Sequence, residues 1–281
     1  MNKIYEIMEI LIPFSWMDYN FMKNAFLGMI IITPLFGVLG TMIVNNKMAF
    51  FSDALGHSAL TGIAIGAIMG IMNTNIVTIV FATIFALLLN RIKRRSTMST
   101  DTVISAFSSF VVAIGLMILS RGGNFARYSS LLVGDILSIS IKDIVSLLMI
   151  FVITMIFWLF RFNKLNAVGV NESLARSKNI NCSLIDDCFS VMIAIIVMFS
   201  IKWIGILIIN ALLILPAASS RNISSNMREY HLFSVMISLF SGIIGLIVSY
   251  YMGTAAGPAV VIFASVIFFL TLFLRPKRTI R

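Results

Sequence analysis

Charged residues are scarce in this chain of 281 residues, at 11% of the total. A soluble domain typically has about 25% charged residues, so a soluble globular protein is excluded. Hydrophobic residues make up 59% of the sequence, mostly in long runs. The runs are continuous rather than alternating, which predicts membrane-spanning helices and not a transmembrane β-barrel. The segments between them are short, so no sizeable soluble domain is expected.

Cysteine is nearly absent, since Cys182 and Cys188 are the only two in the sequence. They are six positions apart in a stretch expected to face the cytoplasm, where thiols stay reduced. We interpret both as free thiols, because one such pair makes neither a zinc knuckle nor a disulfide framework. The sequence also has no Gly-x-x-x-x-Gly-Lys-Ser/Thr phosphate-binding loop. The chain is therefore not expected to hydrolyse ATP or to be an enzyme.

Positive charge outweighs negative charge, with 21 Lys and Arg against 11 Asp and Glu and a formal net charge of +10. In a soluble protein this balance would suggest nucleic acid as a partner. Here the basic residues gather at the ends of apolar runs, in clusters at 91–95, 161–178, 221–228 and 275–281. The positive-inside rule explains that pattern and puts all four clusters on the cytoplasmic side. We therefore expect contact with membrane lipid and no nucleic acid.

The apolar runs predict an all-α fold, a polytopic transmembrane bundle of eight or nine spans. The expected spans are about 21–44, 48–72, 76–90, 101–120, 141–162, 188–201, 204–220, 231–252 and 255–274. An outer turn at Lys202 is expected between the sixth and seventh spans. The stretch 128–139 is too short to cross and is expected to form a short outer helix.

Three regions follow from these spans. Residues 1–20 are expected to form an N-terminal interfacial segment, 21–275 the transmembrane domain and 276–281 a basic cytoplasmic tail. With nine spans and a cytoplasmic C-terminus, the N-terminus lies outside.

The one sizeable polar loop, 163–186, contains Asn171 as a plausible N-cap and Glu172 in the first turn of a short helix.

The second span carries two ionisable residues, Asp53 and His57, which are four positions apart and therefore share one helix face. Ionisable groups inside a membrane helix are costly and usually functional. A carboxylate and an imidazole together form part of a site for a first-row divalent metal ion. Low pH should weaken binding of the ion to such a site. The structural alternative is that Asp53 caps the helix and His57 pairs with it.

Other residues of the same span and of the loops have weaker signals. Small residues form a second ridge at four-residue spacing, which would let another helix approach closely: Ser58, Gly62, Gly66 and Gly70. Asp135 is a candidate for an outer gate, with a helix cap as the alternative. His231, beside two charged residues, is expected to be an interfacial residue rather than a ligand.

Four pieces of the sequence, in order, resemble the membrane subunit of a manganese/zinc-type ABC importer. They are 48–60 (Met-Ala-Phe-Phe-Ser-Asp-Ala-Leu-Gly-His-Ser-Ala-Leu), 131–137 (Leu-Leu-Val-Gly-Asp-Ile-Leu), 172–176 (Glu-Ser-Leu-Ala-Arg), and 205–218 followed by 246–251 and 257–259. Together they span nearly the whole chain. Two departures are visible: Gly56 replaces a usual Ser, and 254–257 replaces a Ser-Gly pair.

This resemblance implies a homodimeric permease in the bacterial inner membrane that imports Mn²⁺ or Zn²⁺, with Fe²⁺ as a further candidate, and holds no permanent cofactor. Two copies of a separate ATPase subunit would dock inside, and an extracytoplasmic metal-binding protein would deliver the ion outside. Asp53 and His57 would bind the ion. A coupling helix within about 169–181 would contact the ATPase through Glu172, Leu174, Ala175 and Arg176.

A different class of transporter remains as the alternative, a proton-coupled secondary carrier with Asp53 as its proton site. Such carriers often contain internal repeats, and no clear repeat is visible in this sequence.

Overall fold

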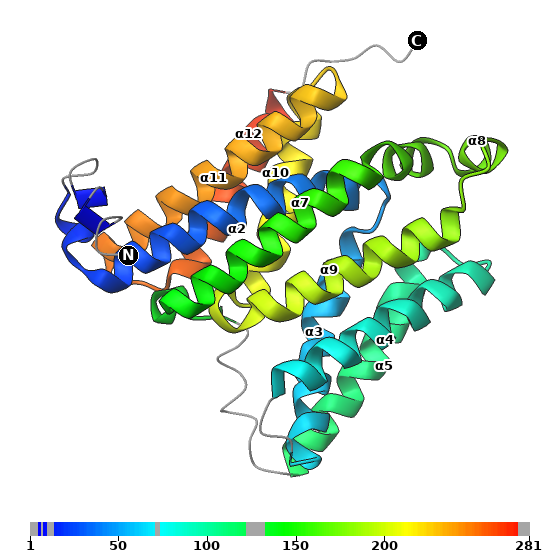
Figure 1. The fold of residues 1–281 in the computed structure, drawn as a ribbon, viewed down its shortest axis with the longest axis horizontal. Helices are drawn as coiled ribbons and strands as arrows, with labels where there is room; N and C mark the ends of the chain where they lie inside the picture. Colours follow the sequence, from blue (N-terminus) through cyan, green and yellow to red (C-terminus); the bar gives the residue numbers. More distant parts are fainter. Residues whose placement is uncertain (1–4, 7, 10–13, 71–73, 122–132, 275–281) are drawn as a thin grey trace.

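The computed structural model describes residues 5–6, 8–9, 14–70, 74–121 and 133–274. Every regular element in this part of the chain is a helix (Figure 1). The elements are η1 Ser15–Asp18, α2 Asn20–Asn45, α3 Ala49–Ile68, α4 Thr74–Arg95, α5 Thr100–Arg121, η2 Ile136–Ser138, α7 Ile141–Val170, α8 Glu172–Ser177, α9 Cys182–Ile204, α10 Ile206–Ile223, α11 Met227–Met252 and α12 Ala256–Phe273. The predicted all-α fold is confirmed.

Eight helices of the described chain are long and apolar enough to cross a membrane: α2, α4, α5, α7, α9, α10, α11 and α12. The ninth long helix, α3, has 20 residues but is less apolar, because Asp53, His57 and several small residues interrupt it. The count of eight or nine spans is therefore confirmed, and α3 is the helix that makes the count ambiguous.

Several helix ends differ from the predicted ones. α4 continues through the basic cluster to Arg95 instead of ending at Asn90, and α7 continues to Val170 instead of Phe162. α9 begins at Cys182, six residues earlier than expected. Lys and Arg are good helix formers, so a basic cluster ends the apolar run without ending the helix.

The turn between α9 and α10 lies at Gly205 and not at Lys202, which is still helical. Gly205 has φ of 81°, in the left-handed region that favours glycine. Gly134 has φ of 72°, and a Cβ built on it would lie 2.3 Å from the Gly205 nitrogen. The two backbones are therefore in direct contact at this turn.

Parts of three sequence predictions lie outside the described residues. The tail 276–281 is one, and residues 128–132 of the expected outer helix are another; its described end contains only the 3₁₀ turn η2. Much of the N-terminal segment 1–20 is the third. These parts, and the outer placement of the N-terminus, stay predictions.

The helices form two groups (Figure 1). In the larger group, α2 packs against α7, α10 and α11, while α12 packs against α10 and α11. Among the eight candidate spans, α2 is the most enclosed, with 67% of its apolar stretch buried, against 17% for α7. The smaller group consists of α3, α4 and α5, and it joins the larger one where α3 and α4 contact α9 and where α3 contacts α10.

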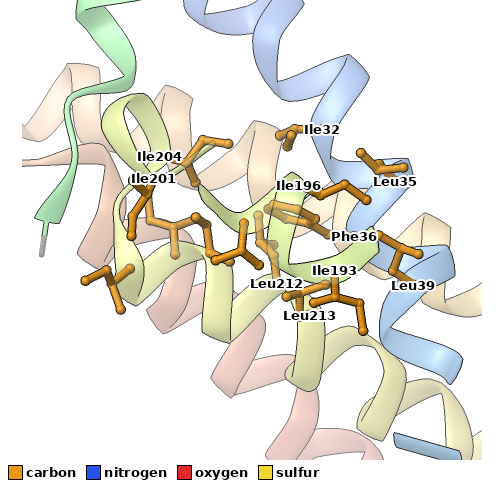
Figure 2. Packing of buried hydrophobic residues seen from close by; sticks show 14 of the residues in the cluster. Ile32, Leu35, Phe36, Leu39, Ile193, Ile196, Ile201, Ile204, Leu212 and Leu213 are labelled. Carbon is orange, nitrogen blue, oxygen red and sulfur yellow. The ribbon is translucent and has the colours of Figure 1, made fainter. Parts of the chain in front are cut away.

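The core fills the space between α2, α9 and α10 (Figure 2). Its labelled members are Ile32, Leu35, Phe36 and Leu39 from α2, Ile193, Ile196, Ile201 and Ile204 from α9, and Leu212 and Leu213 from α10. At Gly40 the two backbones of α2 and α10 meet: a Cβ added there would lie 2.1 Å from the Leu213 carbonyl oxygen. α10 is therefore held tightly against the central helix.

Polar contacts fix the remaining helices. The Ser234 and Ser238 hydroxyls of α11 each donate, at 2.7 Å, to backbone carbonyls of α2. Between α4 and α9, the Arg94 guanidinium donates to both carboxylate oxygens of Asp187 at 2.6 and 3.1 Å. Asn90 donates to the same carboxylate at 2.9 Å. The smaller group is thus tied to the larger one at the end that carries the basic cluster.

Candidate functional site

Asp53 and His57 lie on one face of α3, one turn apart, as the spacing predicted. The His57 Nε2 and Asp53 Oδ1 atoms are 3.5 Å apart, and the side chains are 41% and 48% exposed, respectively. The helix begins at Ala49 and its N-cap is Met48. Asp53 is therefore inside the helix, so the alternative that it caps the helix is wrong, although its pairing with His57 is present.

The two side chains face a cavity of about 270 Å³ between α3 and α5. Besides Asp53 and His57, it is lined by Phe50 and Ala54 of α3 and by Ile104, Ser105, Ser108, Ser109 and Val112 of α5. Carboxylate and hydroxyl oxygens and an imidazole nitrogen are all ligands for divalent first-row ions. The cavity therefore brings together donor atoms of the kinds that bind a small cation.

The ligand set within one copy of the chain is incomplete. In the described part of the chain, no group of three or more His, Cys, Asp or Glu side chains is positioned to hold a metal ion. An ion bound by Asp53 and His57 would need further ligands from hydroxyls, water or a second molecule.

Asn210, on α10, is a site residue that the sequence analysis missed. Its Nδ2 donates to Asp53 Oδ1 at 2.7 Å. Its Oδ1 is buried and has no hydrogen-bond partner among the described residues, a cost of about 1–3 kcal/mol for such a group. An amide inside an apolar run was the available signal, but its partner lies 157 positions away.

Gly56 allows this contact by bringing α3 and α10 close together. A Cβ added at Gly56 would lie 2.7 Å from Ile206 Cγ2 and 3.7 Å from Asn210 Nδ2. The glycine that departs from the resembled pattern therefore lies at the crossing that brings the Asn210 amide to Asp53.

The ridge of small residues on α3 is shorter than expected. Ser58 is fully buried and donates to its own helix at Leu55, and Gly66 is buried. A Cβ on Gly62 would lie 3.2 Å from the Thr78 Cα, so α4 packs closely there. Gly70 lies beyond the end of the helix, exposed and with φ of 63°. It is therefore not part of the ridge, and including it was wrong.

The expected coupling segment contains the helix α8, which has only six residues. The Asn171 side chain caps it by accepting from the Leu174 nitrogen at 3.1 Å. Arg176 donates to Glu172 at 2.6 Å, and this hydrogen bond raises the pKa of the guanidinium. Leu174 is 56% exposed, whereas Ala175 is 1% exposed. Leu174 therefore points away from this chain and Ala175 packs into it.

A polar cavity of about 760 Å³ adjoins α8. The charged residues that line it are Lys47, Lys93, Arg94, Arg176, Glu172 and Asp186. Cations outnumber anions in this lining, so the cavity favours acidic partner groups over a transported cation.

The two remaining candidates behave differently from each other. Asp135 is exposed and makes no cap hydrogen bond from its side chain. It follows Gly134, whose backbone contacts the turn between α9 and α10 at Gly205, and the 30 residues of α7 separate it from α8. His231 is half-buried in α11, with Nδ1 2.6 Å from Thr41 Oγ1 and its ring against Trp158. His231 is thus packed between helices near the start of α11, and its expected place at the membrane interface stays a prediction.

Comparison with known proteins adds to this geometry. Residues 18–275 match the ABC 3 transport family. The chain is 30% identical over 260 residues to the high-affinity zinc uptake system membrane protein ZnuB of Haemophilus influenzae, covering 92% of this chain and 99% of that protein. It is 27% identical over 267 residues to the manganese import system permease protein ScaB of Streptococcus gordonii, covering 93% and 94%.

A solved structure has the same fold. The structure of PsaBC from Streptococcus pneumoniae in complex with Fab matches with a TM-score of 0.81 and 23% sequence identity, covering 100% of this chain and 98% of the matched chain.

Proposed function

This chain belongs to the ABC 3 transport family, and from that premise we propose that it imports divalent transition-metal ions, Mn²⁺ or Zn²⁺. It is the membrane-spanning permease subunit of an ABC transporter, a multi-pass protein of the bacterial inner membrane. Relatives named for zinc uptake and for manganese import support this class of substrate. A proton-coupled secondary carrier is not favoured, because the family couples transport to ATP.

The observation that carries the proposal is the Asp53–His57 pair, which faces a cavity with serine hydroxyls on its α5 side. Two ligand atoms that are each about 2.1 Å from a tetrahedral ion lie about 3.4 Å apart. The Nε2–Oδ1 distance of 3.5 Å therefore suits an ion bound to both atoms with little movement of either side chain. The imidazole binds when neutral and the carboxylate when ionised, so protons compete with the ion.

The remaining ligands come from around the cavity. Ser105, Ser108 and Ser109 supply hydroxyls on the α5 side. In a homodimer, the equivalent groups of a second copy and water would complete the shell. Because half of each ionisable side chain is exposed on one copy, this polar face needs water or a second copy against it within the membrane.

The partners of the permease would meet it at opposite ends. Two copies of an ATPase subunit would contact α8 through the exposed Leu174 and the ion-paired Glu172 and Arg176, beside the basic cavity. An extracytoplasmic metal-binding protein would deliver the ion at the other end, near Asp135.

Uptake of radioactive Mn²⁺ and Zn²⁺ by cells that rely on this importer tests the proposal. Asp53→Ala and His57→Ala should each abolish uptake of both ions at normal expression. Asp101→Ala is the matched control, because Asp101 is an exposed carboxylate at the start of α5 and should transport normally. Normal uptake by the Asp53 and His57 variants would refute the assigned cation site.

A further inference from the structure

Asn210 is a polar residue in an apolar helix, and only one of its two polar atoms has a partner. The amide nitrogen donates to Asp53 Oδ1 at 2.7 Å, while the buried carbonyl oxygen has no partner among the described residues. A leucine would fill similar space without leaving a buried polar group unpaired. The amide therefore stabilises the fold less than a leucine would, and its one evident contribution is the hydrogen bond to Asp53.

This bond controls the orientation of the carboxylate. Asp53 Oδ1 is shared by Asn210 at 2.7 Å and His57 at 3.5 Å. Without the amide, the half-exposed carboxylate could rotate away from the imidazole on its own helix. With the amide in place, the rotation of the carboxylate is restrained at Oδ1, and Oδ2 has no partner among the described residues.

The position of Asn210 is itself rigid. α10 begins directly after the left-handed turn at Gly205. It contacts α3 at Gly56, where no Cβ fits without moving Ile206. Because the donor comes from a helix held on two sides, it can orient Asp53 more firmly than a residue of α3 could.

We propose that Asn210 is a positioning residue for the cation site: it acts through Asp53, holding the carboxylate in the orientation that lets it and His57 bind one divalent ion. This inference rests on the proposed function. Removing a group that orients a metal ligand typically lowers metal affinity by about 10–100-fold. Loss of Asn210 should therefore weaken ion binding by about 10-fold or more.

The test is direct Mn²⁺ binding to the purified complex of the permease with its ATPase, together with thermal unfolding of the same samples. Asn210→Leu removes the donor and also the unpaired carbonyl. Asn210→Asp keeps the shape and the oxygen but cannot donate when ionised. Asp53→Ala is the reference variant, and it should bind no ion.

The expected result is a Kd raised about 10-fold or more in both Asn210 variants, with the unfolding temperature of Asn210→Leu equal to or above that of the unaltered complex. Tight binding by Asn210→Asp but not by Asn210→Leu would overturn the proposal, because the oxygen would then be a ligand. A lowered unfolding temperature for Asn210→Leu would overturn it in favour of a structural role.

The failure of this inference is distinguishable from failure of the proposed function. If Asp53→Ala loses binding while both Asn210 variants bind normally, only the role of Asn210 is refuted. If Asp53→Ala binds Mn²⁺ like the unaltered complex, the cation site itself is refuted.

Discussion

The crossing of α2 and α10 at Gly40 gives a prediction whose size follows from the structure. In Gly40→Ala, the added Cβ would lie 2.1 Å from the Leu213 carbonyl oxygen, whereas carbon–oxygen contacts are normally about 3.3 Å or longer. The two helices must therefore separate by about 1 Å. Overpacking a core typically lowers stability by about 1–3 kcal/mol. Because two helix backbones must move here, we expect a cost of about 3 kcal/mol. Alanine regains about 1 kcal/mol of helix propensity.

The net loss of about 2 kcal/mol corresponds to a fall in Tm of roughly 4 °C. Gly28→Ala is the matched control in the same helix, because its Cβ would meet only the end of the Ile139 side chain, at 3.0 Å. That variant should unfold at or slightly above the unaltered Tm. Thermal unfolding of the detergent-solubilised permease measures both. Equal Tm values for the two alanine variants would refute the close backbone contact.

Two further predictions concern the end of the bundle that carries α8. A cysteine at Leu174 should crosslink to the ATPase, while one at Ala175, which is 1% exposed, should not; the reverse pattern would contradict the orientation of α8. Arg94→Met should lower stability by about 1 kcal/mol, because the pair with Asp187 is partly exposed. A double-mutant cycle with Asp187→Asn checks this, and additive effects of the two changes would refute the coupling.

The sequence was informative wherever an apolar run decides the answer. Each of the nine expected spans corresponds to one long helix of the structure, because burying apolar surface and satisfying the backbone leave no other solution in a membrane. Helix ends were less accurate. α4 continues past the apolar run because Arg and Lys extend a helix in water as well as in lipid headgroups. The extension of α7 over 163–170 has Lys164 as its only basic residue, so a basic cluster does not explain it.

Only part of the candidate site could be predicted from the sequence. Asp53 and His57 could be paired because four-residue spacing on a helix is a local property. The contact between Asp53 and Asn210 is not local, since it depends on how α3 crosses α10. The same limit applies to Ala175, whose burial against its own chain no local pattern could reveal, and to Gly70, since the spacing rule does not say where α3 stops.

The turn at Gly205 has a mechanical consequence. Asn210 is five positions further along the chain, about 7.5 Å along a helix axis. Gly134 meets the turn backbone to backbone, so no side chain at that joint can deform to absorb movement. We therefore expect a displacement of residues 133–134, at the end of the bundle remote from α8, to move the start of α10 and, through Asn210, the carboxylate of Asp53.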